Sequence, residues 1–585
     1  MDPMLGDAAG NRITIPVANE PLRAGPRGER LEVVDYDGGS RRYYEPVDLD
    51  HPALLMQGGL DPVESDPRFH QQMVYAVASR VLENFDTALG RRFRFKGGKP
   101  LRLLPHAFRG ANAFYDPDLS AVLFGYFRAD EENPGPNLPG QTVFTCLSHD
   151  VIAHEVTHAL VHRLRPRYLE ASNRDVLAFH EGFADVVAIF QHFSFPEILT
   201  GAIQETHAHL QSANSLVKLA QQFGYATGSG QALRSAIDDE ADADDPAGEK
   251  RRKRERLKRQ QYETVLEPHE RGSILVASVF DSFFATYQSR IKDLIRIATG
   301  GSGVLPEGDL HPDLVGRIAK EASKSAQNVL TMSIRAFDYL PAVDVTFGDF
   351  LRALVTADTE LVPADDRGLR ASTIEAFRVR GVYPENVVSL AQESLLWEDR
   401  TGEIPDLPVN LLRQQLVLSA RAFDRYAPGR ENDGDPVGPW AAALRAWAVG
   451  NARALDLVPG LPVELGGFHT VFRVSPDGQL LVELVARFVQ TLKGPGDVPP
   501  LRGGTTIVAS SEGRVRYAIS KPLPSKKLRR EAHREGERRK ERHAGLAAEA
   551  ARGDPSLTWG DARSVRRRRA GVSFEALHRA VWGAR

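Results

Sequence analysis

Cysteine is almost absent from this chain of 585 residues, and long apolar runs are missing as well. The single cysteine, Cys146, cannot form an intramolecular disulfide, which excludes a disulfide-stapled scaffold and a cysteine-rich zinc module. No stretch approaches the roughly 20 apolar residues that a membrane-spanning helix needs. The N-terminal residues have neither the basic nor the apolar region of a secretory signal. We therefore expect a soluble, cytoplasmic protein with no membrane partner.

The chain also lacks a net excess of charge, because 74 Lys and Arg oppose 77 Asp and Glu for a formal net charge of −3. This balance conceals two charged segments. Residues 238–260 form a polar insertion whose acidic first part is followed by a basic second part, and residues 526–542 are basic. Exposed loops or helices are the simpler interpretation of both. Contact with a nucleic-acid phosphate backbone is the alternative for the second segment.

Hydrophobic periodicity divides the chain into four parts, for which the predicted fold class is α+β. Residues 1–110 carry short strand-like runs, among them ITIPV at 13–17, and one helical pattern from about Phe69 to Leu89. Residues 111–400 begin with strand-like stretches and continue as mostly helical pattern. Two predicted hairpins indicate a small α+β domain at 405–522. The remainder, 523–585, is expected to be a basic helical or flexible tail.

The sequence HEVTH at 154–158 lies within a helical pattern and contains candidate metal ligands and a candidate general base. Residues four apart share one face of an α-helix, so the imidazoles of His154 and His158 can reach one ion. Neutral imidazole nitrogen is a good zinc ligand. Glu155 follows the first histidine directly and is placed to take a proton from a water molecule that a metal activates.

A catalytic zinc site needs a third protein ligand and one open position. The helical run FHEGFADVV at 179–187 offers Glu181, far enough beyond His158 for a loop and a return helix. Asp185 lies four residues after Glu181 on the same face, where a carboxylate can fix a ligating imidazole. Together the two runs predict a metal centre with its supporting carboxylate.

HExxH followed by ExxxD is the signature of the gluzincin metallopeptidases, and this sequence resembles their thermolysin-like branch. The resemblance covers roughly residues 100–290 with motifs and implies a zincin-like metalloprotease core, β-rich in its N-terminal part (1–110) and helical afterwards. The chain would then be a zinc-dependent endopeptidase acting on a peptide or protein substrate through a metal-activated water. The implied roles are one zinc ion bound by His154, His158 and Glu181, Glu155 as general base, and Asp185 orienting His154.

Three further positions resemble functional elements of that family. The run Asn112-Ala113-Phe114 resembles the substrate-binding edge strand, in which the Asn side chain and the Ala backbone hold the peptide main chain. His269 matches the histidine that stabilises the tetrahedral oxyanion. Tyr168 lies where a tyrosine shares that role, although its spacing to Glu181 is longer than in the family.

The calcium sites of the family are not matched. His192 occupies the position of the main calcium-binding glutamate, and only Asp150 matches another ligand position. One carboxylate does not make a site for an ion that prefers 6 to 8 oxygen ligands. We therefore expect no calcium pair like that of the family.

Two other functions remain open at this point. The chain could be a zinc-binding recognition platform whose basic C-terminal region binds nucleic acid or a protein partner. It could also be a narrow-specificity protease of a regulatory or defence system, with the insertion 238–260 as a candidate cover for the cleft. Glu155 favours an enzyme, because a binding platform has no chemical need for a general base. The sequence predicts neither the substrate nor the oligomeric state.

Overall fold

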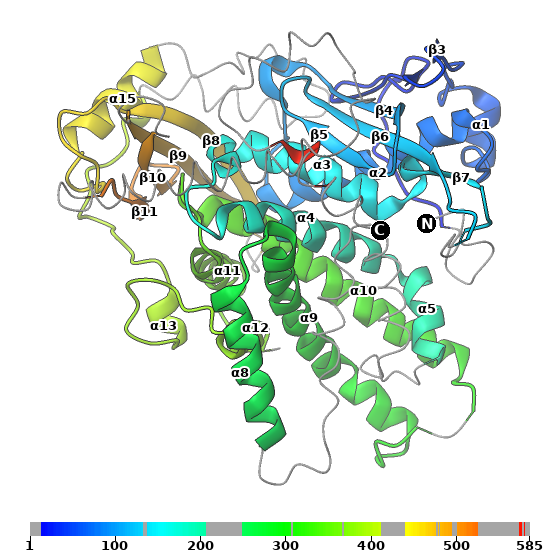
Figure 1. The fold of residues 1–585 in the computed structure, drawn as a ribbon. Coiled ribbons are helices and arrows are strands. Elements are labelled where there is room, and N and C mark those ends of the chain that lie inside the picture. Colours follow the sequence, from blue (N-terminus) through cyan, green and yellow to red (C-terminus); the bar gives the residue numbers. More distant parts are fainter. Residues whose placement is uncertain are drawn as a thin grey trace.

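The structure is a computed structural model, and it describes residues 13–132, 137–205, 249–305, 308–365, 368–410, 439–474, 478, 480–493, 500–524, 573–575 and 578. Within these residues the fold is mixed α+β, as predicted (Figure 1). The basic segment 526–542 and the acidic part of the insertion lie outside the described residues.

A curled mixed sheet forms the N-terminal part of the molecule, with strand order β1-β4-β6-β5 and β7 paired with β6. The pairs β1–β4 and β4–β6 are parallel, whereas β5 and β7 run antiparallel to β6. This sheet joins strands from both sides of residue 110, so the first two predicted parts share one structural unit. The strands are β1 (Leu31–Val33), β4 (Leu101–Arg109), β5 (Ala113–Asp116), β6 (Ala121–Arg128) and β7 (Thr142–Phe144).

Three shorter elements and one long helix accompany this sheet. Strands β2 (Tyr36–Asp37) and β3 (Arg42–Tyr43) pair with each other, and α1 (Pro52–Gln57) follows them. The predicted helix is α2 (Pro67–Leu89), which begins two residues earlier than expected because Asp66 caps it and Pro67 occupies its first turn. Residues 13–17 form no strand, contrary to the prediction. Pro16 within that run lacks the N–H group that a strand ladder requires.

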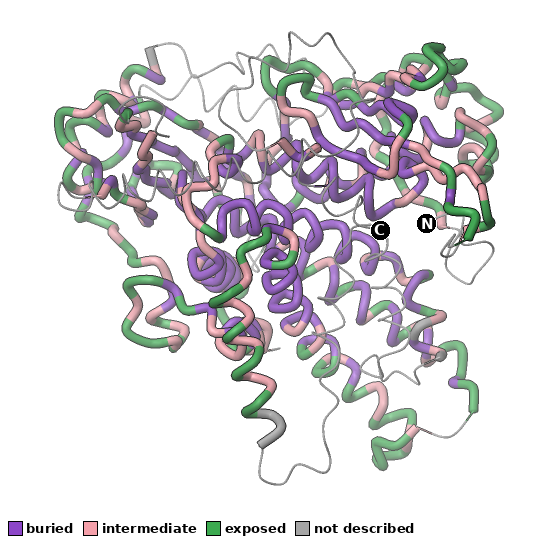
Figure 2. The backbone as a smooth tube through the Cα atoms, viewed as in Figure 1, coloured by how far each residue is buried: buried purple, intermediate pink, exposed green. Residues whose placement is uncertain are grey.

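Helices make up most of the middle of the chain and lie below the sheet in Figure 1. Helices α3 and α4 are buried along almost their whole length and form the centre of the molecule (Figure 2). The helices are α3 (His149–Leu164), α4 (Val176–Phe193), α5 (Pro196–Glu205), α8 (Glu249–Thr264), α9 (Pro268–Ala298), α10 (Pro312–Arg335), α11 (Phe347–Leu361), α12 (Leu369–Val379) and α13 (Gln392–Leu395), with 3-10 turns at Lys96–Gly98, Thr145–Leu147, Pro166–Leu169 and Ala336–Tyr339.

The basic half of the insertion forms α8, which has many exposed side chains, as predicted for a charged helix. It packs against α12. Tyr262 on α8 donates a hydrogen bond to Asp175 at 2.9 Å, next to the start of α4. The described part of the insertion therefore contacts the helical body.

The two predicted hairpins form one antiparallel sheet of order β11-β10-β9-β8. Alternate residues of β9 face opposite sides, as a strand requires. Leu484 and Phe488 join a core with α15 (Pro439–Gly450), whereas Val485 joins the main core. This region is thus connected to the rest of the molecule through a shared core. The strands are β8 (Glu464–Val474), β9 (Leu480–Leu492), β10 (Leu501–Ser510) and β11 (Val515–Lys521).

Within the described part of the chain, no helix combines the length and the apolar composition needed to cross a membrane.

Candidate metal centre

Helices α3 and α4 carry the predicted ligands and pack against each other. Ser148 caps α3 by accepting a hydrogen bond from the Val151 backbone N–H. Asp150 lies in the first turn, where the helix dipole stabilises its negative charge. His154 and His158 lie one turn apart on α3 and are both buried. Glu181 on α4 is buried as well. A buried carboxylate between buried imidazoles is costly unless the groups are paired or coordinate a metal.

Four imidazole rings converge on one oxygen of Glu181. Their Nε2 atoms lie 3.3–3.5 Å from Glu181 Oε2, although the rings come from three separate parts of the chain. A tetrahedral zinc centre with ligand distances of about 2.0–2.2 Å places its donor atoms about 3.3–3.6 Å apart. Each Nε2 therefore lies at the distance from Glu181 Oε2 that two donors of one zinc ion would have, and a tetrahedral ion could use at most three of the four rings beside Glu181. The four histidines are His154, His158, His269 and His578.

Each of the four rings also has an outer partner at Nδ1. Nδ1 of His154 donates to Asp185 at 2.8 Å, the contact that the sequence predicted. Nδ1 of His269 lies 2.9 Å from Glu267 Oε1. A histidine that binds a metal almost always uses its other nitrogen in this way, which fixes the tautomer and the ring orientation. The two remaining contacts are His158 Nδ1 to His180 Nδ1 at 2.8 Å and His578 Nδ1 to the Ala113 carbonyl oxygen at 2.9 Å.

Two atoms at the centre of this cluster have no hydrogen-bond partner. They are His158 Nε2 and Glu181 Oε1, both fully buried. Such orphaned atoms are rare in native interiors and require an explanation, for which an ion is a standard one. The residues present therefore fit a bound divalent cation, and two nitrogens with one carboxylate oxygen suit zinc.

The pKa values in the cluster follow from burial and from the neighbouring charges. Burial lowers the pKa of His158 to about 3, which keeps the ring neutral as a ligand must be. Burial also opposes charge on His154, but its hydrogen bonds to Asp185 and Glu181 outweigh this and raise its pKa to about 10. A cation would compete with that proton at Nε2. Burial likewise opposes ionisation of Glu181, yet the surrounding imidazoles hold its pKa well below the usual range.

Glu155 connects the cluster to the edge strand of the sheet. Its Oε2 accepts a hydrogen bond from the Tyr115 backbone N–H at 3.0 Å, and its Oε1 lies 3.1 Å from His578 Nδ1. Strand β5, which holds Tyr115 and Ala113, pairs with β6 on one side, and the part of the chain that is described supplies no strand on its other side. The predicted general base thus lies directly between the metal donors and an edge strand.

His269 reaches the cluster because α9 approaches α4 very closely. At the crossing, Gly182 faces Gly272, and a Cβ atom on Gly182 would lie only 2.5 Å from the Gly272 carbonyl oxygen. Glu181 and His269 each lie within three residues of this contact. Glycine at both positions therefore allows the start of α9 to lie beside Glu181.

Tyr168 does not join the cluster, which corrects the prediction for this residue. It is fully buried, and its hydroxyl donates to the Pro341 carbonyl oxygen at 2.7 Å. Its ring packs against Phe179. Phe179 precedes Glu181 by two residues and so faces nearly the opposite side of α4. The Tyr168 hydroxyl is thus bonded to Pro341, and among the described residues it makes no hydrogen bond to the histidine cluster.

Asp150 and His192, the two positions compared above with calcium ligands, form a separate buried cluster with His149. His192 Nδ1 lies 2.8 Å from Asp150 Oδ1, and His149 Nδ1 lies 3.0 Å from the same oxygen. These three side chains are close enough together to be considered as metal donors. Two imidazoles and one carboxylate lack the oxygen ligands that calcium prefers.

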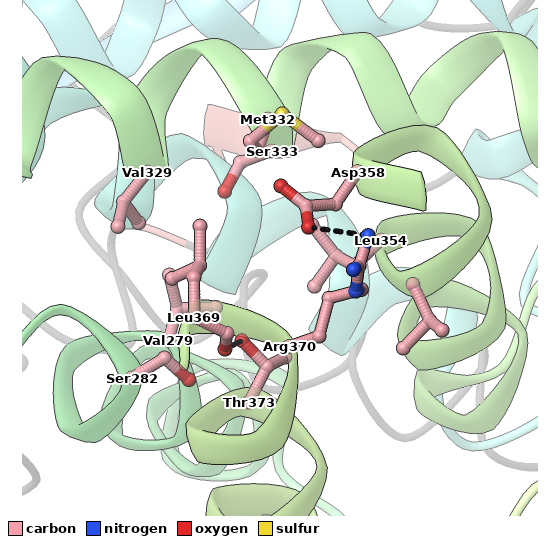
Figure 3. A pocket seen from close by; sticks show the side chains of 11 residues that line it. Val279, Ser282, Val329, Met332, Ser333, Leu354, Asp358, Leu369, Arg370 and Thr373 are labelled. Carbon is pink, nitrogen blue, oxygen red and sulfur yellow. Dashed lines mark hydrogen bonds and ion pairs between the residues drawn. The ribbon is translucent and has the colours of Figure 1, made fainter. Parts of the chain in front are cut away.

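A small pocket lies elsewhere, among α9, α10, α11 and α12 (Figure 3). It contains an ion pair between Arg370 and Asp358 at 3.3 Å. Burial raises the pKa of Asp358 to about 6 despite this partner. None of the four histidines lines this pocket, so it is separate from the candidate metal centre.

Sequence reasoning assigned no role at the site to His180, Phe574 or His578, and it did not predict the contacts of Tyr115 and Glu267. His180 directly precedes Glu181 of a recognised motif, so a position close to the site could have been predicted for it. Phe574 and His578 could not, because they come almost 400 residues after Glu181 and belong to no pattern at that site.

Comparison of the chain with protein-family models, with curated proteins and with solved structures finds no match. The function is therefore inferred from the site.

Proposed function

We propose that the chain is a zinc-dependent endopeptidase with a zincin-like core of the thermolysin-like gluzincin type. The observation that carries this proposal is that Nε2 of His154 and Nε2 of His158 lie 3.5 and 3.3 Å from Glu181 Oε2, with Glu155 grouped beside the two histidines. When bound, zinc would supply Lewis-acid activation of a water molecule and of the scissile carbonyl. His154, His158 and Glu181 would hold the ion, and Asp185 would fix His154.

The remaining steps belong to side chains of the site. Glu155 would take the proton of the attacking water and pass it to the leaving amine. Its hydrogen bond from Tyr115 holds the carboxylate beside the edge strand. His269, with Nδ1 directed at Glu267, would present Nε2 to the developing oxyanion when that nitrogen carries a proton. Substrate would lie along β5, aligned by main-chain hydrogen bonds near Asn112 and Ala113.

The test compares zinc-loaded wild type with Glu155→Gln on a quenched peptide library. The variant keeps every proposed ligand, so we expect unchanged zinc content and a loss of turnover of about 10²–10⁴-fold, the usual contribution of a general base. Glu132→Gln, at an exposed position, is the matched control and should cleave as wild type does. Equal cleavage by Glu155→Gln and wild type would contradict the mechanism.

A further inference from the structure

A short segment from near the end of the chain lies inside the candidate site. We call Phe574, Glu575 and His578 the C-terminal plug. In Figure 1 it is the red segment beside β5 and α3. The side chains of Phe574 and His578 are only 2 % and 3 % exposed, so the plug is packed into the interior of the site.

Phe574 covers the imidazole of His158. The two rings are stacked, with centroids 4.2 Å apart and planes inclined by 26°. The Phe574 ring also lies 5.0 Å from His180 and 6.1 Å from Tyr115. An aromatic ring on this face of His158 excludes water and any substrate side chain from the same place.

His578 is held in the orientation of a metal ligand. A carbonyl oxygen can only accept a hydrogen bond, so the 2.9 Å contact to Ala113 requires a proton on His578 Nδ1. In the neutral ring Nε2 then carries a lone pair, and this atom lies 3.4 Å from Glu181 Oε2. His154 and His158 offer donor atoms within 4.8 Å of a His578 donor atom. His578 therefore completes a set of three imidazoles and one carboxylate.

The plug also uses the groups expected to hold substrate. The Asn112 side-chain amide approaches the Glu575 carbonyl oxygen at 3.5 Å, and the Ala113 carbonyl accepts from His578. Glu155 has one oxygen 3.1 Å from His578 Nδ1. The edge strand, the base and the metal donors thus all contact the same segment, and a peptide substrate would need the same contacts.

We propose that the C-terminal plug is a built-in inhibitor in which His578 is the fourth protein ligand of the metal and Phe574 closes the cleft over His158. Four protein ligands make a closed structural-type site, whereas a catalytic site keeps one position open. This inference rests on the proposed metallopeptidase function. The enzyme is then latent, and displacement of the plug opens both the metal position and the edge strand.

The first test observes the metal, without any substrate. Cobalt(II) is loaded into wild type, His578→Ala and the control His311→Ala, which removes an exposed imidazole. Acetohydroxamate is then titrated while the visible absorption is followed. We expect His578→Ala to bind the chelator at least about tenfold more tightly than wild type. In wild type only the molecules with a displaced plug can bind acetohydroxamate, so the apparent affinity is reduced by the fraction of those molecules. Equal affinity in all three proteins would overturn the proposal.

Phe574→Ala serves as a second variant, because it leaves every proposed ligand in place. It should also increase hydroxamate affinity, by a smaller factor than His578→Ala. If His578→Ala fails to fold by circular dichroism, the result for Phe574→Ala decides: affinity equal to wild type would overturn the proposal.

The second test measures cleavage and separates the two proposals. The double variant Phe574→Ala/His578→Ala should cleave quenched peptides at least about tenfold faster than wild type. Adding Glu155→Gln should abolish this gain. Improved hydroxamate binding without any cleavage would support the plug and refute the peptidase. Glu155-dependent cleavage at equal rates in wild type and double variant, with equal hydroxamate binding, would support the peptidase and refute the plug.

Discussion

The candidate metal centre contrasts with another buried histidine cluster, distinct from that of His149 and His192. In that cluster, which we call the Asp35 relay, His106 Nδ1 lies 2.6 Å from Asp35, His106 Nε2 lies 2.7 Å from His70 Nδ1, and His70 Nε2 donates to the Glu64 carbonyl at 2.8 Å. Every ring nitrogen has a partner at hydrogen-bond distance. At the candidate metal centre, four Nε2 atoms face one oxygen at 3.3–3.5 Å, and two central atoms have no hydrogen-bond partner.

The difference suggests how buried histidines that only stabilise the fold can be distinguished from those that are candidates for binding a metal ion. The Asp35 relay satisfies its own polar groups and connects an N-terminal segment, α2 and β4. The candidate metal centre pairs the outer nitrogens closely and directs the inner ones at one oxygen of Glu181 over 3.3–3.5 Å. Metal-binding residue type and burial are shared by both clusters; the donor spacing separates them.

Replacing one histidine in each cluster tests the comparison most strongly. We expect His158→Ala to bind zinc at least about 100-fold more weakly, since losing merely an outer partner of a ligand costs 10–100-fold. His70→Ala should keep its zinc and instead lose about 1–3 kcal/mol of stability, because it leaves polar neighbours unpaired. Metal analysis after dialysis and thermal unfolding measure the two effects. Loss of zinc from His70→Ala but not from His158→Ala would reverse the assignment.

Lowering the pH should destabilise the folded protein through the Asp35 relay. Burial, together with the neighbouring His106, lowers the pKa of His70 to about 4, against about 6.5 in an unfolded chain. Between these pH values the unfolded state binds a proton that the folded state does not. The free energy of unfolding should therefore fall as the pH is lowered from 6.5 to 4, by up to about 3 kcal/mol from this residue.

Urea unfolding at several pH values measures this effect. His70→Gln lacks the titrating group, so its stability should depend less steeply on pH over the same window. Identical pH dependence in His70→Gln and wild type would show that the relay is not the source.

Asp185→Asn should have a smaller effect than the histidine replacements and the change of pH. The amide can still accept from His154 Nδ1 through its oxygen, but it lacks the charge that increases the basicity of the ring. We expect zinc affinity to fall by about 10–100-fold. Competition with a fluorescent chelator measures it, with the exposed Asp313→Asn as control. Unchanged affinity would mean that Asp185 has no part in the site.

The sequence predicted the elements whose signals are local. The spacing of apolar residues indicated α2, and the turn residues indicated the hairpins of the second sheet. HExxH and ExxxD located two helices and five of the buried groups at the centre. The strand expected at 13–17 failed because an apolar run does not form a strand without a pairing partner, and Pro16 removes a donor. The prediction for Tyr168 failed because the length of chain between His158 and Glu181 does not determine which way the Tyr168 side chain points.

By itself, the sequence determined the α+β class and the identity of the candidate ligands, because helical periodicity places residues four apart on one face. Only the tertiary structure decided what completes the site. Contact between β5 and His578, or between His158 and Phe574, joins residues separated by more than 400 positions. No local pattern encodes such contacts, because they depend on how distant surfaces pack once each element has formed.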